Sequence, residues 1–310
     1  MTTQTPVRPE TRAGQEEPQR KKGVRLASAF YLMVLPAFLL FFVFHTIPVI
    51  QGVYYSFTDS PGYGPSEFVG LRNYIALFTD PRVLHAYWFT FLIAAVATIL
   101  VNIVSLAIAI GLNGKIKFKN GLRGIYFVPN VLAILVVGYI FNYLFSNSLP
   151  ALGEKLGIDA LSTSLLTKAS TAWIAIVILA VWQSAAFNII IYLAGLQTVP
   201  TEMYEAADLD GASAWRQFRS VTLPLLRPVL ALVLVVTVTG SFQIFDTVAV
   251  TTGGGPVNAT RVIYLYIYDL AFSQLDFGYA SALSVVLFAV LLVVALVQLK
   301  LLRADESDNA

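Results

Sequence analysis

The sequence predicts an all-α, polytopic membrane protein with six transmembrane helices, and two observations support this prediction. Hydrophobic residues make up 57% of the 310 residues and charged residues only 12%, whereas soluble domains carry roughly 25% charged residues. The apolar residues also gather into runs of about 20 residues or more, which at about 1.5 Å per helical residue cross a hydrocarbon core of about 30 Å. The six runs cover about residues 30–50, 87–112, 125–145, 172–199, 225–250 and 280–299.

Each apolar run is expected to be helical because lipid offers no hydrogen-bond partner to a bare peptide group. A β-barrel would need short alternating strands, which this sequence lacks. The first run follows about 28 polar residues and precedes no small-residue cleavage site, so it is expected to be retained as a span. The predicted organisation is a disordered tail at 1–28, a transmembrane domain at 29–303 that contains a polar loop at 200–224, and a short tail at 304–310.

Lysine and arginine indicate the orientation, because they resist translocation and accumulate on the cytoplasmic side. They concentrate in the N-terminal tail, between the second and third runs, in and just after the loop at 200–224, and near the C-terminus. The opposite side carries Arg72, Arg82, Lys155, Lys168 and Arg261. Both termini and the loop at 200–224 are therefore predicted to be cytoplasmic.

Several classes of function are disfavoured by what the sequence lacks. The phosphate-loop pattern is absent, since the nearest string, Gly111 to Lys115, has the wrong spacing and no following hydroxyl residue. The chain contains no cysteine and two distant histidines, so a metal site is not expected. The small net charge of +2 follows from membrane topology and gives no case for nucleic-acid binding.

The polar loop at 200–224 has the pattern of two short helices joined at a glycine. Thr201 is predicted to cap a first helix that runs to about Asp210 and carries acidic residues in its first turn. Gly211 permits a sharp change of direction, and Ser213 is predicted to cap a second helix to about Ser220. By helix chemistry alone, an ordinary interfacial hairpin and a docking element are equally good interpretations.

The spacing within this loop resembles that of a known family. Glu205-Ala206-Ala207, then Gly211 after three residues, then Val221-Thr222-Leu223-Pro224 after nine, is similar to the EAA loop of binding-protein-dependent ABC importer permeases. Only Val221 departs from the family pattern, which has Ile there. The stretches at 68–74, 245–246 and 252–256, together with Pro129 and Trp182, look like the carbohydrate-uptake branch, in particular its maltose and glycerol-3-phosphate type first permease subunit. The resemblance covers about residues 30–303.

The resemblance implies an ABC type I importer permease fold and a non-enzymatic role in an assembly. The chain would form half of a sugar pathway in a bacterial inner membrane, in a heterodimer with a second homologous permease. Two cytoplasmic ATPase subunits would bind ATP and Mg, so no cofactor is expected in this chain, and an extracytoplasmic solute-binding protein would deliver the sugar. The residues implied in coupling to the ATPase are Glu205, Ala206, Ala207, Asp208, Asp210, Gly211, Leu223 and Pro224.

A pathway for a sugar needs amides, hydroxyls and aromatic faces inside otherwise apolar helices. Such groups in the spans include Asn142, Trp182 and Gln243. With the positions that the maltose-type resemblance implies, the predicted pathway residues are Asn130, Ile134, Gln183, Ser184, Asn188, Thr237, Ser241, Ile244 and Asp246. Each polar member has an alternative role in bonding between helices. Two roles fit Asp246, namely a bond to a substrate hydroxyl and a bond to the backbone before the TTGGGP turn.

Two other classes of function compete with this interpretation. A secondary active transporter of a small polar solute would need an ion-coupling site within the spans and no docking loop. A membrane-embedded enzyme would need a convergent set of His, Asp or Glu side chains. The sequence shows neither set, and both remain as alternatives to be tested.

Overall fold

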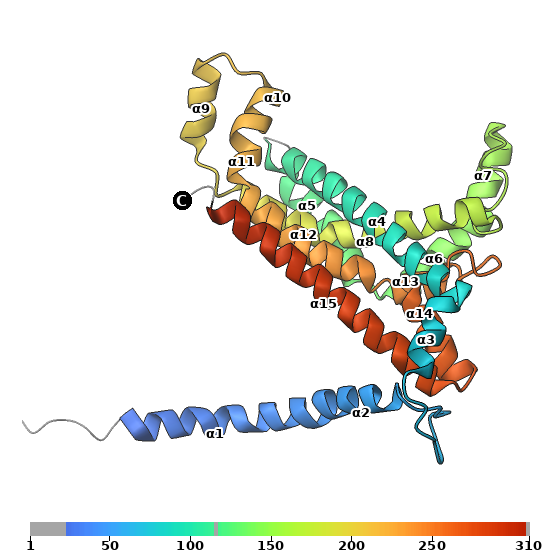
Figure 1. The fold of residues 1–310 in the computed structure, drawn as a ribbon. Helices are drawn as coiled ribbons and strands as arrows, with labels where there is room; N and C mark the ends of the chain where they lie inside the picture. The colour runs from blue at the N-terminus through green and yellow to red at the C-terminus, as the bar shows by residue number, and fades with distance from the viewer. Residues whose placement is uncertain (1–22, 115–116, 308–310) are drawn as a thin grey trace, which may run out of the picture. The chain divides into compact units, whose positions relative to one another are not determined.

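The computed structural model describes residues 23–114 and 117–307, and within them the regular elements are helices (Figure 1). In the described residues, one isolated antiparallel β-bridge pairs the backbones of Thr58 and Phe68. Residues 1–22, which make up most of the predicted N-terminal tail, lie outside the described residues. The all-α class predicted from the apolar runs is confirmed. Two units, Met1–Gln51 and Gly52–Ala310, are described separately below.

The first unit contains the first apolar span. Helix α1 (Gly23–Phe41) continues through a π-helical turn, η1 (Phe42–Thr46), into α2 (Ile47–Tyr55), which extends into the second unit. The apolar stretch Tyr31–Tyr55 is 25 residues long. Helix α1 begins within the range predicted for the tail, and the side chains of 31–44 are exposed. Apolar side chains exposed around a helix of this length are suited to contact with lipid.

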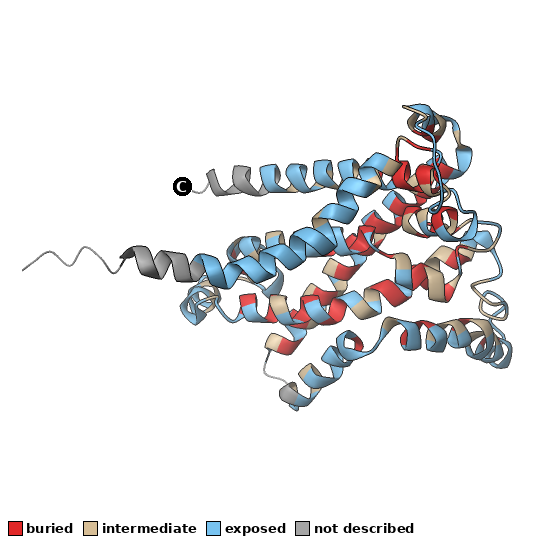
Figure 2. Ribbon diagram, turned by 90° about the horizontal axis from the view of Figure 1, so that it is seen from below, coloured by how far each residue is buried: buried red, intermediate tan, exposed pale blue. Residues whose placement is uncertain are grey.

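The second unit is built on four long helices. Helix α4 (Pro81–Asn113) packs along α8 (Ala169–Leu196), α12 (Arg227–Phe242) packs against both, and α15 (Phe277–Ser307) contacts α12. Buried positions lie on the sides of these helices that face one another, and exposed positions lie on their outer sides (Figure 2). The predicted runs at 87–112, 172–199 and 280–299 fall within α4, α8 and α15, apart from three residues after α8.

The third predicted run is interrupted. Helix α5 (Lys119–Val131) contains Pro129 and ends at an extended break, Leu132 and Ala133, before α6 (Ile134–Tyr143). A π-helical turn, η2 (Leu144–Ser148), then leads into α7 (Leu149–Leu156), where the sequence predicted a short helix. Pro129 lacks the N–H that would bond to the Ile125 carbonyl, so it weakens the helix before it, whereas the break itself follows it. The longest apolar helical stretch here is Ile134–Leu156, shifted from the predicted 125–145.

The fifth predicted run is also interrupted. After α12 the chain leaves helical geometry at Gln243 and Ile244 and then forms α13 (Phe245–Thr251), which packs against α6. At the other end of α12, the preceding segment Ala214–Leu225 is bent by 72° from Arg227–Phe242. In the described residues, five helices are long and apolar enough to cross a membrane, or six if this bent pair is one span.

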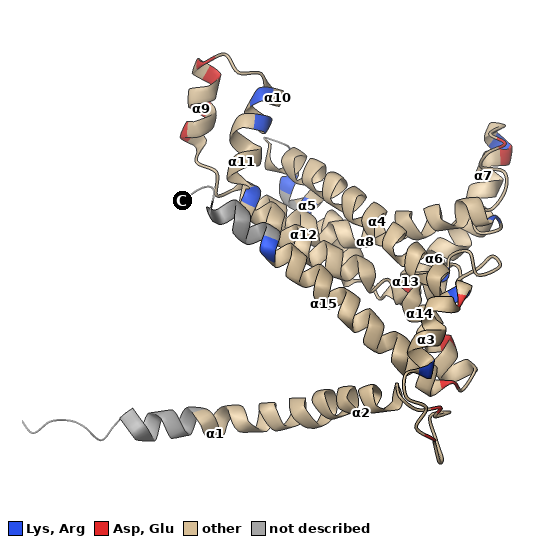
Figure 3. Ribbon diagram, in the orientation of Figure 1, with Lys and Arg blue, Asp and Glu red and all other residues tan. Residues whose placement is uncertain are grey.

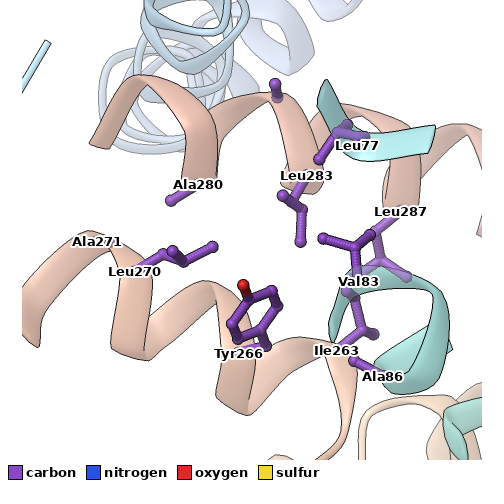
Figure 4. Packing of buried hydrophobic residues seen from close by; sticks show 11 residues of the cluster. Leu77, Val83, Ala86, Ile263, Tyr266, Leu270, Ala271, Ala280, Leu283 and Leu287 are labelled. Atoms are coloured by element: carbon purple, nitrogen blue, oxygen red, sulfur yellow. The ribbon is translucent and has the colours of Figure 1, made fainter. Parts of the chain in front are cut away.

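A compact apolar cluster joins four helices at one end of the second unit (Figure 4). Helix α3 (Arg72–Thr79) contributes Leu77, α4 contributes Val83, α14 (Ile263–Tyr268) contributes Tyr266, and α15 contributes Leu283.

Asp80 caps α4 by accepting from the Arg82 backbone N–H at 2.9 Å, and its carboxylate also accepts from the Tyr266 hydroxyl at 3.3 Å. Partial burial raises the pKa of Asp80, but these hydrogen bonds and the Arg82 charge outweigh it and leave the pKa lowered.

Charged side chains of the second unit gather at its two ends and leave the long helices between them nearly free of charge (Figure 3). One end carries α9 (Thr201–Leu209) and α10 (Ala214–Gln217), and we call it the hairpin end. The opposite end carries α3, α7 and α14. Such a belt without charges is what a membrane-spanning bundle requires, because a charge at mid-membrane costs several kcal/mol.

Candidate functional site

The first candidate site is the hairpin at 200–225, which contains α9, α10, a π-helical turn η3 (Phe218–Thr222) and α11 (Leu223–Leu225). The two short helices predicted from the sequence are confirmed. The prediction that Thr201 caps the first helix is wrong, because Thr201 is already its first helical residue. Pro200 stands at the cap position with φ −61° and ψ 137°, and no side chain there accepts a backbone N–H.

The turn between the helices follows a known C-terminal capping pattern. Gly211 has a φ of +69°, a conformation that glycine adopts without the strain a Cβ brings. Its N–H donates to the Asp208 carbonyl at 3.0 Å, and the Ala212 N–H donates to the Ala207 carbonyl at 2.9 Å, which is the Schellman arrangement. Ser213 caps α10 as predicted, since its hydroxyl accepts from the Arg216 N–H at 3.4 Å.

Side-chain hydrogen bonds join the arms of the hairpin at two places, and we call these two contacts ties. Near the tip, the Gln217 amide donates to the Asp208 carboxylate at 2.5 Å and to the Ala212 carbonyl at 3.1 Å. Near the base, the hydroxyls of Tyr204 and Thr222 are 3.0 Å apart. Sequence reasoning missed both ties, because Gln217 and Tyr204 belong to no recognisable spacing pattern. The ties hold α9 against the following segment.

The hairpin presents a mixed acidic and apolar surface. Among the predicted coupling residues, Glu205, Ala206, Asp208, Asp210 and Gly211 are exposed, while Ala207, Leu223 and Pro224 are half-buried. Beside Gly211, the side chains of Leu209 and Trp215 are 91% and 70% exposed. Two large apolar side chains exposed at a turn are typical of a surface that a protein or a membrane contacts.

The second candidate site is a cavity of about 260 Å³ inside the second unit. It lies where α12 breaks at Gln243 and Ile244, and α4, α6, α8 and α13 complete its wall. Non-helical backbone at membrane depth is tolerated where it lines a cavity, so the break and the cavity belong together. The lining residues are Ala97, Ile134, Ala180, Gln183, Ser184, Gly240, Ser241, Gln243, Ile244, Asp246 and Thr247.

Most of the predicted pathway residues meet in this cavity. Ile134, Gln183, Ser184, Ser241, Ile244 and Asp246 come from three different spans and line it together. Thr247 also lines the cavity, and sequence reasoning missed it. The break before α13 decides which residues of α13 face the cavity. No sequence pattern predicted the exact position of this break.

The remaining predicted pathway residues lie elsewhere. Asn188 is buried, and its amide donates to the Thr237 hydroxyl at 2.7 Å, which in turn donates to the Val233 carbonyl at 2.7 Å. This pair therefore bonds α8 to α12, the alternative role noted for such residues. Asn130 is exposed at the end of α5 and does not line the cavity.

Asp246 is exposed toward the cavity rather than buried. Within the described residues, its carboxylate has no hydrogen-bond or ion-pair partner. The predicted bond from Asp246 to nearby backbone is therefore not formed. The carboxylate remains available to whatever enters the cavity.

Apolar spans, an exposed polar hairpin at one end and a polar cavity at a helix break together define a multi-pass α-helical membrane protein with the architecture of a transport component. Residues 103–304 match the family described as binding-protein-dependent transport system inner membrane component. This match covers more than half of the chain, which therefore belongs to that family. The resemblance drawn from the EAA spacing is confirmed.

Relatives over nearly the whole chain agree with this assignment. The chain is 39% identical to the multiple sugar-binding transport system permease protein MsmF of Streptococcus mutans, over 85% of this chain and 91% of that protein. It is 37% identical to the arabinooligosaccharides transport system permease protein AraP of Bacillus subtilis, over 88% of both chains. A bacterial ABC transporter that imports alginate has the same fold, with a TM-score of 0.80, 22% identity, and coverage of 91% of this chain and 98% of that one.

Proposed function

We propose that this chain is the permease subunit of an ATP-driven sugar importer and forms half of its translocation pathway. The observation that carries this proposal is the cavity at the α12 break, whose wall gathers amide and hydroxyl groups from separate spans. Such groups match the hydroxyls of a sugar. Support comes from the relatives, whose names refer to multiple sugars and to arabinooligosaccharides.

The hairpin is proposed to dock into a cytoplasmic ATPase and to transmit its movement to the spans. Glu205, Ala206, Ala207 and Gly211 would form the contact, and the exposed Leu209 and Trp215 would enter the same interface. Support for a cytoplasmic position comes from the basic residues near the hairpin, because lysine and arginine accumulate on that side. Among them are Arg216, Arg219 and Arg227.

The full assembly proposed here contains a second homologous permease, two ATPase subunits that bind ATP and Mg, and an extracytoplasmic solute-binding protein. The proposed location is the inner membrane of a bacterial cell. A solved alginate transporter complex includes a periplasmic protein bound to an alginate pentasaccharide, which supports the fold but not the choice of sugar. Sugar-binding assays on the solute-binding protein, with a panel of mono- and oligosaccharides, would identify the substrate.

The test of this function uses the complete importer reconstituted in proteoliposomes. Glu205 is exposed and carries the acidic charge at the centre of the proposed contact. We expect Glu205→Lys to insert normally and to reduce ATP-driven sugar uptake more than about tenfold, because loss of one charge-assisted contact and introduction of a like charge cost at least about 1.4 kcal/mol. Uptake and ATP hydrolysis are measured together.

The matched control is Glu202→Lys, because Glu202 is an exposed acid on the same helix but outside the proposed contact. It should leave uptake near the unsubstituted level. Full uptake by Glu205→Lys would contradict the coupling role. Uptake that persists without ATP under an ion gradient would instead support the secondary transporter.

A further inference from the structure

An open groove runs along α8 on the side that packs against α5, and it shares no lining residue with the cavity at the α12 break. The groove has two adjoining parts of about 430 and 370 Å³, which have Tyr126, Ala186 and Ile189 in common. Helices α5 and α8 line the part nearer the hairpin end, and α4 joins them in the other part.

The walls of this groove are almost entirely hydrocarbon. The polar side chains among the lining residues are Arg123 and Gln197, together with the rings of Tyr126 and Trp182. The groove therefore lacks the spread of amides and hydroxyls that a sugar needs, and it suits a hydrocarbon chain instead. It opens on the outside of this chain, where Tyr126 and Ile190 are exposed.

The single charge in the groove is Arg123, which lies toward the hairpin end. Its neighbour Leu122 packs against the apolar cluster that contains Leu196 and Leu226, at the base of the hairpin. Within the described residues, the Nε of Arg123 is buried without a hydrogen-bond partner, and neither ion pair involves this residue. A buried donor without an acceptor is costly, and a guanidinium matches a phosphate in shape and charge.

The length of the groove fits one leaflet of a bilayer. Gln197 and Val181 mark its two ends on α8, sixteen residues apart, which corresponds to about 24 Å of helix. Half of a bilayer measures about 20–23 Å, including its headgroup layer. The arginine therefore lies at the depth of the headgroups, and the apolar walls lie at the depth of the acyl chains.

We propose that this groove binds one anionic phospholipid, whose phosphate pairs with Arg123 and whose acyl chain lies between α5 and α8. An anionic headgroup is favoured over a zwitterionic one because the lining residues include no acid that could pair with an ammonium group. The assignment to the cytoplasmic leaflet rests on the proposed cytoplasmic position of the hairpin. Basic pockets between spans on that side are suited to anionic headgroups.

The binding experiment uses the complete importer in detergent and native mass spectrometry. The probes are phosphatidylglycerol and phosphatidylcholine with identical acyl chains. We expect phosphatidylglycerol to bind at least about fivefold more tightly, and Arg123→Gln to remove most of this preference, because one basic residue at the membrane surface contributes roughly that much. Arg123→Lys keeps the charge and should keep most of the preference.

The matched control is Arg227→Gln, because Arg227 is an exposed arginine at the start of α12 and lies outside the groove. This variant loses the same charge and should leave the preference unchanged. Ala194→Phe tests the apolar wall, since Ala194 is an exposed lining residue. It keeps Arg123 but narrows the groove, so it should weaken the binding of phosphatidylglycerol.

A phosphatidylglycerol with a photoactivatable group in its acyl chain locates the site. We expect its adducts on the stretches 123–131 and 181–197, and fewer of them in Arg123→Gln. An unchanged preference in Arg123→Gln, or adducts confined to other helices, would overturn the proposal. Cross-linking of Ala194→Cys to the second permease in high yield, without lipid adducts, would assign the groove to that subunit instead.

These outcomes are independent of the transport function. Lipid binding is measured without sugar or ATP, so an importer that takes up sugar normally can still fail this test. Loss of the transport function would show as absence of ATP-driven uptake by the unsubstituted importer.

Discussion

The hairpin and the cavity differ in how their residues come together. The hairpin is formed by residues within 200–225, and its contacts join neighbours such as Gly211 with Asp208 and Gln217 with Asp208. The cavity joins residues as distant as Ala97 and Thr247 from five helical segments. The comparison shows that the proposed contact surface is encoded locally, while the proposed substrate site requires the packing of the bundle.

The two regions also differ in the kind of side chain that they expose. The hairpin exposes large apolar side chains, Leu209 and Trp215, whereas the cavity exposes amides and a carboxylate inside an apolar bundle. An exposed apolar tip is stabilised by covering it with a partner, and a polar recess is stabilised by a solute or water that hydrogen-bonds. The following variants test the hairpin and the cavity separately.

The largest effect is expected from Gly211→Val, which places a β-branched residue at a φ of +69°. This conformation costs an L-residue at least about 1–2 kcal/mol, so the turn should open and ATP-driven uptake should fall more than about tenfold. The matched control is Gly157→Val at the end of α7, where φ is +67° and, as at Gly211, a Cβ would meet nothing within 4 Å. Equal losses in both variants would mean that general destabilisation, rather than the hairpin, explains the effect.

The cavity should respond to Gln183→Leu, which removes an amide from the lining without breaking a hydrogen bond of the described residues. Loss of one bond to a sugar hydroxyl costs about 0.5–1.5 kcal/mol, so uptake at low sugar concentration should fall roughly three- to tenfold. The melting temperature of the purified importer should not change. A drop in stability with unchanged uptake would remove Gln183 from the pathway.

Asn188→Leu should behave in the opposite way. Asn188 donates to Thr237 between α8 and α12 and is absent from the cavity. Its replacement should lower the unfolding free energy by about 0.6–2 kcal/mol, the range for hydrogen bonds between membrane helices, and leave the apparent sugar affinity unchanged. A double-mutant cycle with Thr237→Val measures the coupling, and an altered affinity would return Asn188 to the pathway.

The smallest effect is expected from Gln217→Ala, which removes the tie from α10 to Asp208. An exposed tie of this kind contributes about 0.5–1.5 kcal/mol, so amide exchange in 206–212 should rise by roughly two- to tenfold while the bundle is unaffected. Arg219→Ala is the control, since Arg219 is exposed on the same arm. Equal exchange in the two variants would show that the tie does not order the tip.

Much of the architecture was predictable because membrane helices obey strict local rules. Length and apolar content place the spans, and Gly211 and Ser213 place the turn and the cap of the hairpin. The Thr201 cap was mispredicted because both Pro200 and Thr201 suit a helix start, and one residue of shift lies within the usual uncertainty of helix ends. The shifted third span has a different cause, since the break after Val131 lies beyond Pro129 and coincides with no helix-breaking residue in the sequence.

By itself, the sequence determined the helical class, the approximate spans, the hairpin and the family resemblance, because each depends on residues close together in the chain. Only the tertiary structure decided which polar residues share the cavity, why Asn188 and Thr237 bond to each other instead, and that Asp246 has no partner among the described residues. The physical reason is that an amide or carboxylate on a buried helix has several possible partners. The rotation of each helix and the position of its break select among them.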